Sequence, residues 1–326
     1  MKLYIDKENI RSLMKSKESD FVKECLRMIR NNIDVRYNFE KTNDLMNDDA
    51  MKVWFSQTAG QGKRNETSYS QDASDIVPSR PLTIAKIESL DSGELPLNHG
   101  IFLIDDEEGC RNVSQYNCVM VGYVGQETDI FRKLLDIKED HETFVSKIRS
   151  WSSYCPIFPL TDIVLSDNFY FARKRVYERN DNGIIRALVS GVRNYPVNVV
   201  ILAKMPDKED VRLFDFDDEV CNIRDAIGDV TGNYTSKVTI IIVDKEMHDR
   251  YAISNYYRVK SGAGFQIKNN GVKDDVTADI KSHVNRNSED VSNQLLDNYQ
   301  QLVDDAMRNR NNAKCYGDRV SNLLEF

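Results

Sequence analysis

A short polar segment in the second half of the chain has the residue types and the spacing of a phosphate site. His248 is followed by Arg250 and then by Asn255, and a turn of small residues with Gly262 and Gly264 comes next. On an extended segment, residues two apart point to the same face, so His248 and Arg250 can face one phosphate together. Arginine grips phosphate oxygens through paired N–H donors, and histidine attacks phosphorus or carries a proton near neutral pH. The glycines let backbone N–H groups come close to an anion.

This spacing, His-x-Arg-x4-Asn with a glycine turn behind it, resembles a degenerate phospholipase D motif. It is similar also to the phospholipase-D-like C-terminal domain of eukaryotic MIT-domain proteins. Three positions depart from the motif of the enzymes, because Arg250 replaces lysine, Asn255 replaces a carboxylate and Ala263 replaces serine. The enzymes join two such motifs, so that one histidine attacks phosphorus and the other protonates the leaving group, whereas this sequence has one motif. The resemblance implies a phosphate-binding domain that has lost catalysis and needs no cofactor at this site.

The segments around this motif alternate between strand and helix. Apolar runs predict strands at residues 162–170, 197–202 and 238–243, and apolar residues at helical spacing predict helices at residues 184–194 and 217–230. Pro196 and Gly232 follow the two helices as stop signals. The alternation predicts an α/β sheet flanked by helices. His248 follows its last strand, at the edge where such sheets bind ligands.

Length and pattern together predict two domains and a tail. We expect an α/β domain of unknown type at residues 1–155, a phospholipase-D-like domain at residues 156–285 and a helical segment at residues 286–326. Ser288 is expected to cap the helix of that segment. The apolar residues at the end of the chain are expected to dock on the protein body or on a second copy.

A weaker candidate site lies in the first domain, where predicted strands at residues 2–5 and 100–106 end in acidic residues. Asp6, Glu8, Asp105 and Asp106 would meet at the carboxyl edge of a sheet, and their oxygens suit Mg²⁺ or Mn²⁺. The strand that ends in Asp6 resembles the start of PIN-like nucleases, which implies a metal-dependent nuclease. The alternative interpretation is that these acids cap the helices that follow the strands.

Composition narrows the classes of function. The net charge of −8 argues against a general attraction to nucleic acid, so phosphate recognition has to be local. The six cysteines are scattered without a C-x-x-C pair, which is typical of reduced thiols. No apolar stretch reaches the ~20 residues of a membrane helix, and the first residues do not form a signal peptide. We therefore expect a cytoplasmic protein that does not act at membranes.

Three functions stay open on these grounds. A fourth, recruitment to phosphoinositide membranes, is implied by the resemblance to the eukaryotic domain but is disfavoured by the acidic net charge and the lack of a continuous basic patch. A binding module would hold nucleic acid or another phosphate-bearing partner, including a partner protein, in a bacterial conflict or defence system. A homodimer would bring two copies of His248 together and so restore histidine-dependent phosphodiester cleavage. The third function is the metal-dependent nuclease of the first domain.

Overall fold

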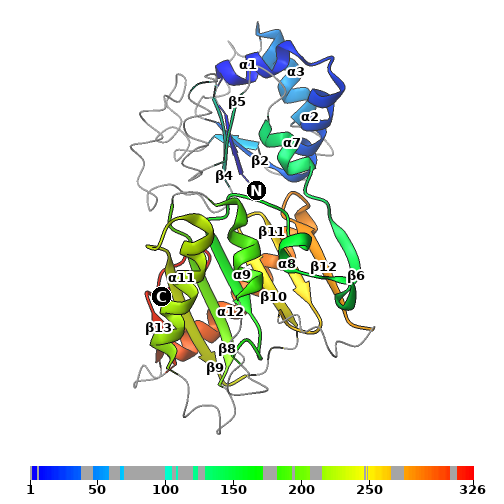
Figure 1. Ribbon diagram of the computed structural model, residues 1–326. Helices are drawn as coiled ribbons and strands as arrows, with labels where there is room; N and C mark the ends of the chain where they lie inside the picture. Colours follow the sequence, from blue (N-terminus) through cyan, green and yellow to red (C-terminus); the bar gives the residue numbers. More distant parts are fainter. Residues whose placement is uncertain are drawn as a thin grey trace. The chain divides into compact units, whose positions relative to one another are not determined.

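The computed structural model has two compact units, each with its own sheet (Figure 1). The first consists of Met1–Ile137 with Val284–Arg286, and the second of Lys138–His283 with Asn287–Phe326. The structure describes residues 2–5, 7–37, 47–58, 67–69, 100–104, 108, 120–123, 129–171, 182–192, 195–205, 215–245, 247, 249–265, 275–308 and 314–326. Both sheets are accompanied by helices, which confirms the expected α/β class.

The first unit is built on a parallel sheet, whose described strands have the order β3-β2-β1-β4-β5. Parallel strands need crossover connections, and helices follow β1, β2 and β5 along the chain. The apolar residues Cys25, Leu26 and Ile29 are buried on one side of α2. The elements are β1 (Lys2–Tyr4), α1 (Lys7–Lys15), α2 (Asp20–Asn32), β2 (Asp34–Tyr37), α3 (Asp49–Thr58), β3 (Thr67–Tyr69), β4 (Gly100–Ile104), β5 (Met120–Tyr123) and α7 (Asp129–Leu135).

The second unit is built on a mixed sheet, whose described strands have the order β13-β9-β8-β7-β10-β11-β12-β6. The neighbours β7, β8 and β9 are parallel, whereas β10, β11, β12 and β6 pair antiparallel in turn on the β7 side. The elements are β6 (Asp140–Phe144), α8 (Trp151–Tyr154), β7 (Asp162–Ser166), α9 (Gly183–Leu188), β8 (Asn198–Lys204), α11 (Phe216–Thr231), β9 (Lys237–Val243), β10 (Arg250–Ser254), β11 (Tyr257–Ser261), β12 (Thr277–Ser282), α12 (Arg286–Arg308) and β13 (Cys315–Gly317).

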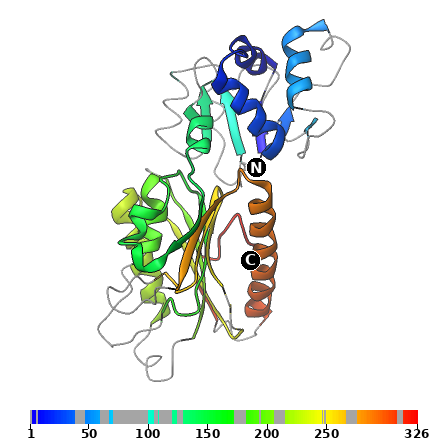
Figure 2. The same ribbon diagram turned by 90° about the vertical axis from the view of Figure 1, so that its right-hand side faces the viewer.

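Helices cover both faces of this second sheet. Figure 2 shows α12 on one face, and α9 and α11 on the other. Tyr299 and Val303 of α12 share a buried cluster with Val200 and Ile241 of the sheet. Covering on both faces explains why β7, β8 and β9 are continuous apolar runs. Compared with the expected domain at residues 156–285, this unit starts earlier, because it includes β6 and α8, and ends later, because α12 packs into its core.

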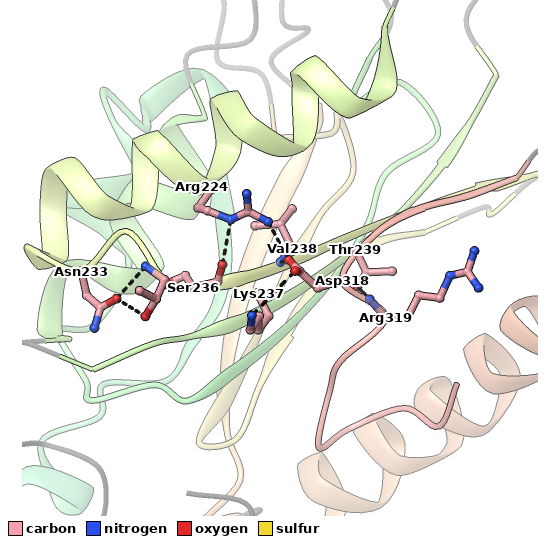
Figure 3. Close-up of polar contacts among 9 residues, drawn as sticks. Arg224, Asn233, Ser236, Lys237, Val238, Thr239, Asp318 and Arg319 are labelled. Atoms are coloured by element: carbon pink, nitrogen blue, oxygen red, sulfur yellow. Dashed lines mark hydrogen bonds and ion pairs between the residues drawn. The ribbon is translucent and has the colours of Figure 1, made fainter.

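The C-terminal segment is fixed to the edge of the sheet by β13 and by Asp318. Oδ2 of Asp318 accepts hydrogen bonds from Nη2 of Arg224 at 2.8 Å and from the backbone N–H of Val238 at 2.9 Å (Figure 3). Nζ of Lys237 lies 3.8 Å from Oδ1. Burial acts to raise the pKa of Asp318, but these contacts outweigh it and hold the pKa below its usual range. Leu324 is buried further along, against α12 and the sheet, so the segment docks on the protein body.

We expect Asp318→Asn to destabilise the second unit by about 2 kcal/mol near pH 7, the contribution of hydrogen bonds to a charged group. Because the folded pKa lies below the unfolded value of about 3.9, this contribution is present above that value and is lost as the pH falls through the folded pKa. Urea unfolding of parent and variant, compared near neutral pH and near pH ~3, should show the difference shrinking in acid. Asp305→Asn removes an exposed carboxylate of α12 and controls for the loss of one charge. A difference that stays constant in acid would contradict this role for Asp318.

Within the described residues, no helix combines the length and the apolar character that crossing a bilayer requires.

Candidate functional site

The candidate site lies at the edge of the second sheet where β7, β8 and β9 end and β10 begins. Arg250 is the first residue of β10, and its neighbour Tyr251 pairs with Ser166, the last residue of β7. On its other side, Arg250 pairs with Ser261, the last residue of β11. Ligands of α/β sheets bind at the carboxyl ends of the parallel strands. The pairing therefore places Arg250 at the edge expected for a ligand.

The Arg250 side chain is held by two neighbours. Its Nη1 donates a hydrogen bond to the backbone oxygen of Gly262 at 2.9 Å. Its Cζ lies 5.5 Å from the centre of the Phe169 ring, which is a cation–π contact. The side chain is partly buried. These contacts orient the planar guanidinium before any ligand arrives.

A buried carboxylate organises the turn next to Arg250. Asp167 follows β7 and is only 1% exposed. Its Oδ1 accepts the backbone N–H of Phe169 at 2.9 Å, and its Oδ2 accepts that of Phe265 at 3.0 Å. Burial raises the pKa of the Asp167 carboxyl, although both N–H groups and the positive charge of Arg250 act to lower it. Asp167 thus ties the end of β7 to the segment after β11.

The two predicted glycines lie in that segment and have different roles. Gly264 has φ +86°, and a Cβ atom there would lie 2.9 Å from Oδ2 of Asp167. A side chain at this position would therefore be strained and would crowd the carboxylate. The backbone N–H of Gly262 donates to the oxygen of Thr277 at 3.0 Å. The N–H of Gly262, which was expected to face an anion, is thus already engaged within the sheet.

Asn255 lies at the other end of β10, in the turn that joins this strand to β11. Five residues of strand at about 3.3 Å each separate it from Arg250 by roughly 16 Å along the chain. Asn255 is fully buried, and its Oδ1 accepts the backbone N–H of Thr161 at 3.2 Å. The structure brings Arg250, Gly262 and Gly264 together and places Asn255 away from them, as a residue that fastens the hairpin to the start of β7.

Four of the other predicted site residues, His248, Asp6, Asp105 and Asp106, lie outside the described residues. The chain neighbours of His248 are described. Met247 exchanges hydrogen bonds with the side chain of Asn168, and Asp249 pairs with Lys260 at 3.2 Å. Met247 is therefore attached to the turn after β7, and Asp249 to β11.

The strands that precede the acidic residues of the first unit are neighbours. β1 and β4 pair in parallel, with Tyr4 opposite Phe102. In the described part of the chain, no group of three or more His, Cys, Asp or Glu side chains is arranged to hold a metal ion. The Mg²⁺ or Mn²⁺ site stays a prediction.

Two residues of the site were not predicted as functional. Asp167 and Phe169 fall in the segment predicted as a strand up to residue 170, yet β7 ends at Ser166 and a turn follows. The signal for this turn is the Asp167-Asn168 pair, because Asp side chains accept a backbone N–H two residues on and so interrupt a strand.

Searches of protein-family models, curated proteins and solved structures found no match to this chain. The second unit is an α/β domain with a mixed sheet, and an oriented arginine lies at the end of the sheet where its parallel strands finish. Its function is inferred from these residues and their geometry.

Proposed function

We propose that the second unit is a phospholipase-D-like domain that has lost catalysis. It is a binding module for nucleic acid, and Arg250 holds a phosphate of that ligand. The observation that carries the proposal is the Arg250 guanidinium, oriented by Gly262 and Phe169 at the carboxyl end of β7. A guanidinium offers planar, paired N–H donors that match two phosphate oxygens. Orienting it in advance lowers the entropy lost when a phosphate binds.

Two ion pairs at the carboxyl ends of the parallel strands occupy carboxylates that would otherwise repel a phosphate. Asp249 pairs with Lys260 at 3.2 Å, and Asp244 pairs with Lys314. These two carboxylates already have cationic partners. A nearby phosphate is therefore less repelled than the acidic composition of the chain suggests.

The placement of the described histidines, His141 and His283, supports a site without catalysis. The backbone N–H of His283 donates to Tyr256 O, which puts it at the hairpin end of β10, and its Nε2 is bonded to Ser292. His141 lies on β6 and contacts Lys281. Within the described residues, neither reaches the edge that holds Arg250. A second histidine for phosphodiester cleavage would have to come from elsewhere.

Arg250→Ala is expected to weaken binding of a fluorescein-labelled oligonucleotide about tenfold, the usual effect of losing one charge-assisted phosphate contact. The slope of log affinity against log salt should fall by about 1. Fluorescence anisotropy at several salt concentrations measures both quantities.

A matched control is Arg224→Ala. Arg224 is also a partly buried arginine that donates to a backbone oxygen, that of Ser236 at 3.1 Å. It differs in position, because it lies beside the start of β9 (Figure 3), at the opposite end of the parallel strands. This variant removes the same charge and should keep the parent affinity. Equal affinity of Arg250→Ala and the parent would contradict the proposal. Metal-independent cleavage of the oligonucleotide that disappears in His248→Ala would overturn the loss of catalysis.

A further inference from the structure

The aromatic ring of Phe169, which contacts Arg250, is exposed at this end of the sheet. Phe169 is 52% exposed, although Asp167, Asn168, Tyr170 and Phe171 around it are buried. A large apolar side chain that stays exposed among buried neighbours loses favourable burial energy. Such a ring is typical of a surface that contacts a partner.

The backbone under Phe169 is fixed from several sides. Its own N–H is bound by Asp167, and the following residue donates to the backbone oxygen of Asp167 at 3.2 Å. The preceding Asn168 exchanges hydrogen bonds of 2.6 and 3.1 Å with the backbone of Met247. The ring is thus presented on a rigid turn, so little conformational entropy is lost when a ligand stacks on it.

A second apolar side chain continues this surface. Lys204 at the end of β8 donates its backbone N–H to Asn168 O at 3.4 Å, so the next residue, Met205, follows β8 beside the Phe169 turn. Met205 is 44% exposed. An aromatic ring, a thioether and a guanidinium therefore lie along one edge of the sheet.

We propose that the ligand of this edge is single-stranded nucleic acid, with a base stacked on Phe169 and a phosphate held by Arg250, an inference that rests on the proposed function. A nucleotide carries an aromatic base and a phosphate on one sugar, which matches the adjacent ring and guanidinium. The bases of a duplex are already stacked on each other, so they cannot stack on Phe169, whereas those of a single strand can.

An anionic membrane is the competing occupant, because exposed Phe and Met side chains beside cations also suit a lipid surface. Membrane attraction needs a run of basic residues over a broad face. Among the described cations at this edge, Lys260 and Lys314 are paired with carboxylates. The local contact of one ring with one guanidinium favours a nucleotide.

The test uses the full chain and a labelled oligothymidylate of about twelve nucleotides, within the usual footprint of a single-strand site. Phe169→Ala and Phe169→Leu should each weaken binding about tenfold, whereas Phe169→Trp should bind at least as well as the parent, because stacking requires a ring. All three variants should keep the parent unfolding midpoint, since the side chain is half-exposed. A leucine variant that binds like the parent would overturn stacking.

An oligonucleotide of the same length with abasic sites separates this inference from the proposed function. Arg250→Ala should weaken binding to both oligonucleotides by similar factors. Phe169→Ala should weaken binding to the oligonucleotide with bases by a clearly larger factor than binding to the abasic one, where only its contact with Arg250 is lost. If Arg250→Ala weakens both while Phe169→Ala weakens neither, or weakens both equally, the phosphate site stands and the base contact fails. If neither has an effect, both fail. The parent protein could instead sediment with anionic vesicles, and Phe169→Ala could lose this sedimentation while its oligonucleotide affinity stays unchanged. That result would identify an anionic membrane, and not nucleic acid, as the ligand of this edge.

Discussion

Replacing Gly317 by alanine is expected to destabilise the second unit by about 3 kcal/mol, from a positive φ combined with overpacking. Gly317 ends β13 with φ +89°. A Cβ atom there would lie 2.1 Å from the backbone oxygen of Val238. That oxygen also accepts the N–H of Asp318 at 3.0 Å. It therefore cannot move away without weakening a hydrogen bond that holds the C-terminal segment on β9. The added methyl group therefore acts against the backbone of β9.

Gly228→Ala is the matched control. A Cβ atom at Gly228 would lie at nearly the same distance, 2.2 Å, from another atom, but that atom belongs to the Tyr234 ring, which is 55% exposed. The ring can swing outward into solvent. Alanine also stabilises the interior of a helix such as α11 by up to about 1 kcal/mol relative to glycine. We expect this variant to stay within about 1 kcal/mol of the parent.

The two tryptophans of the chain allow the measurement to be made on one unit. Trp54 lies in the first unit and Trp151 in the second. In a Trp54→Phe background, the fluorescence of Trp151 reports the urea unfolding of the second unit. Equal unfolding midpoints for the Gly317 and Gly228 variants would contradict the expected destabilisation. They would show that the C-terminal segment adjusts to an added methyl group as easily as an exposed ring does.

Much of the central sheet could be predicted because its signals are local. The strands β7, β8 and β9 are apolar runs. The helix α11 has a residue typical of a helix start at one end and a residue typical of a helix end at the other. The Asp215 side chain accepts the N–H groups of Asp217 and Asp218, and Gly232 adopts φ +75°. These signals depend on residues within a few positions of each other.

The arrangement of the site depends on distant pairs and could not be predicted in this way. β10 returns antiparallel against β7, 85 residues earlier, as the contact between Tyr251 and Ser166 shows. The sequence spacing suggested that Arg250 and Asn255 share a pocket, but a hairpin sends them to opposite ends of one strand. Nothing local reveals which strand a segment will pair with, so the neighbours of Arg250 became visible only in the fold.

Trp151→Ala is expected to destabilise the second unit by about 4 kcal/mol, as for other buried tryptophans replaced by alanine. Trp151 begins α8 and is almost fully buried. Its ring lies 5.3 Å from that of Phe265 and 5.9 Å from that of Tyr154, and its Nε1 donates to Phe265 O at 2.6 Å. Removing it leaves a cavity and a buried carbonyl without its donor. Urea unfolding followed by far-UV circular dichroism measures the loss.

Trp151→Phe is the milder variant. Phenylalanine keeps one aromatic ring at this position but removes the N–H donor and part of the buried indole volume, so a cost of about 1–3 kcal/mol is expected. Because Phe265 also donates to Asp167 beside Arg250, a loosened Phe265 should weaken oligonucleotide binding in both variants, and more so in Trp151→Ala. If Trp151→Ala instead unfolds like the parent and binds like it, then α8 does not support the turn of Gly264. The orientation of Arg250 would then depend on its contacts with Gly262 and Phe169.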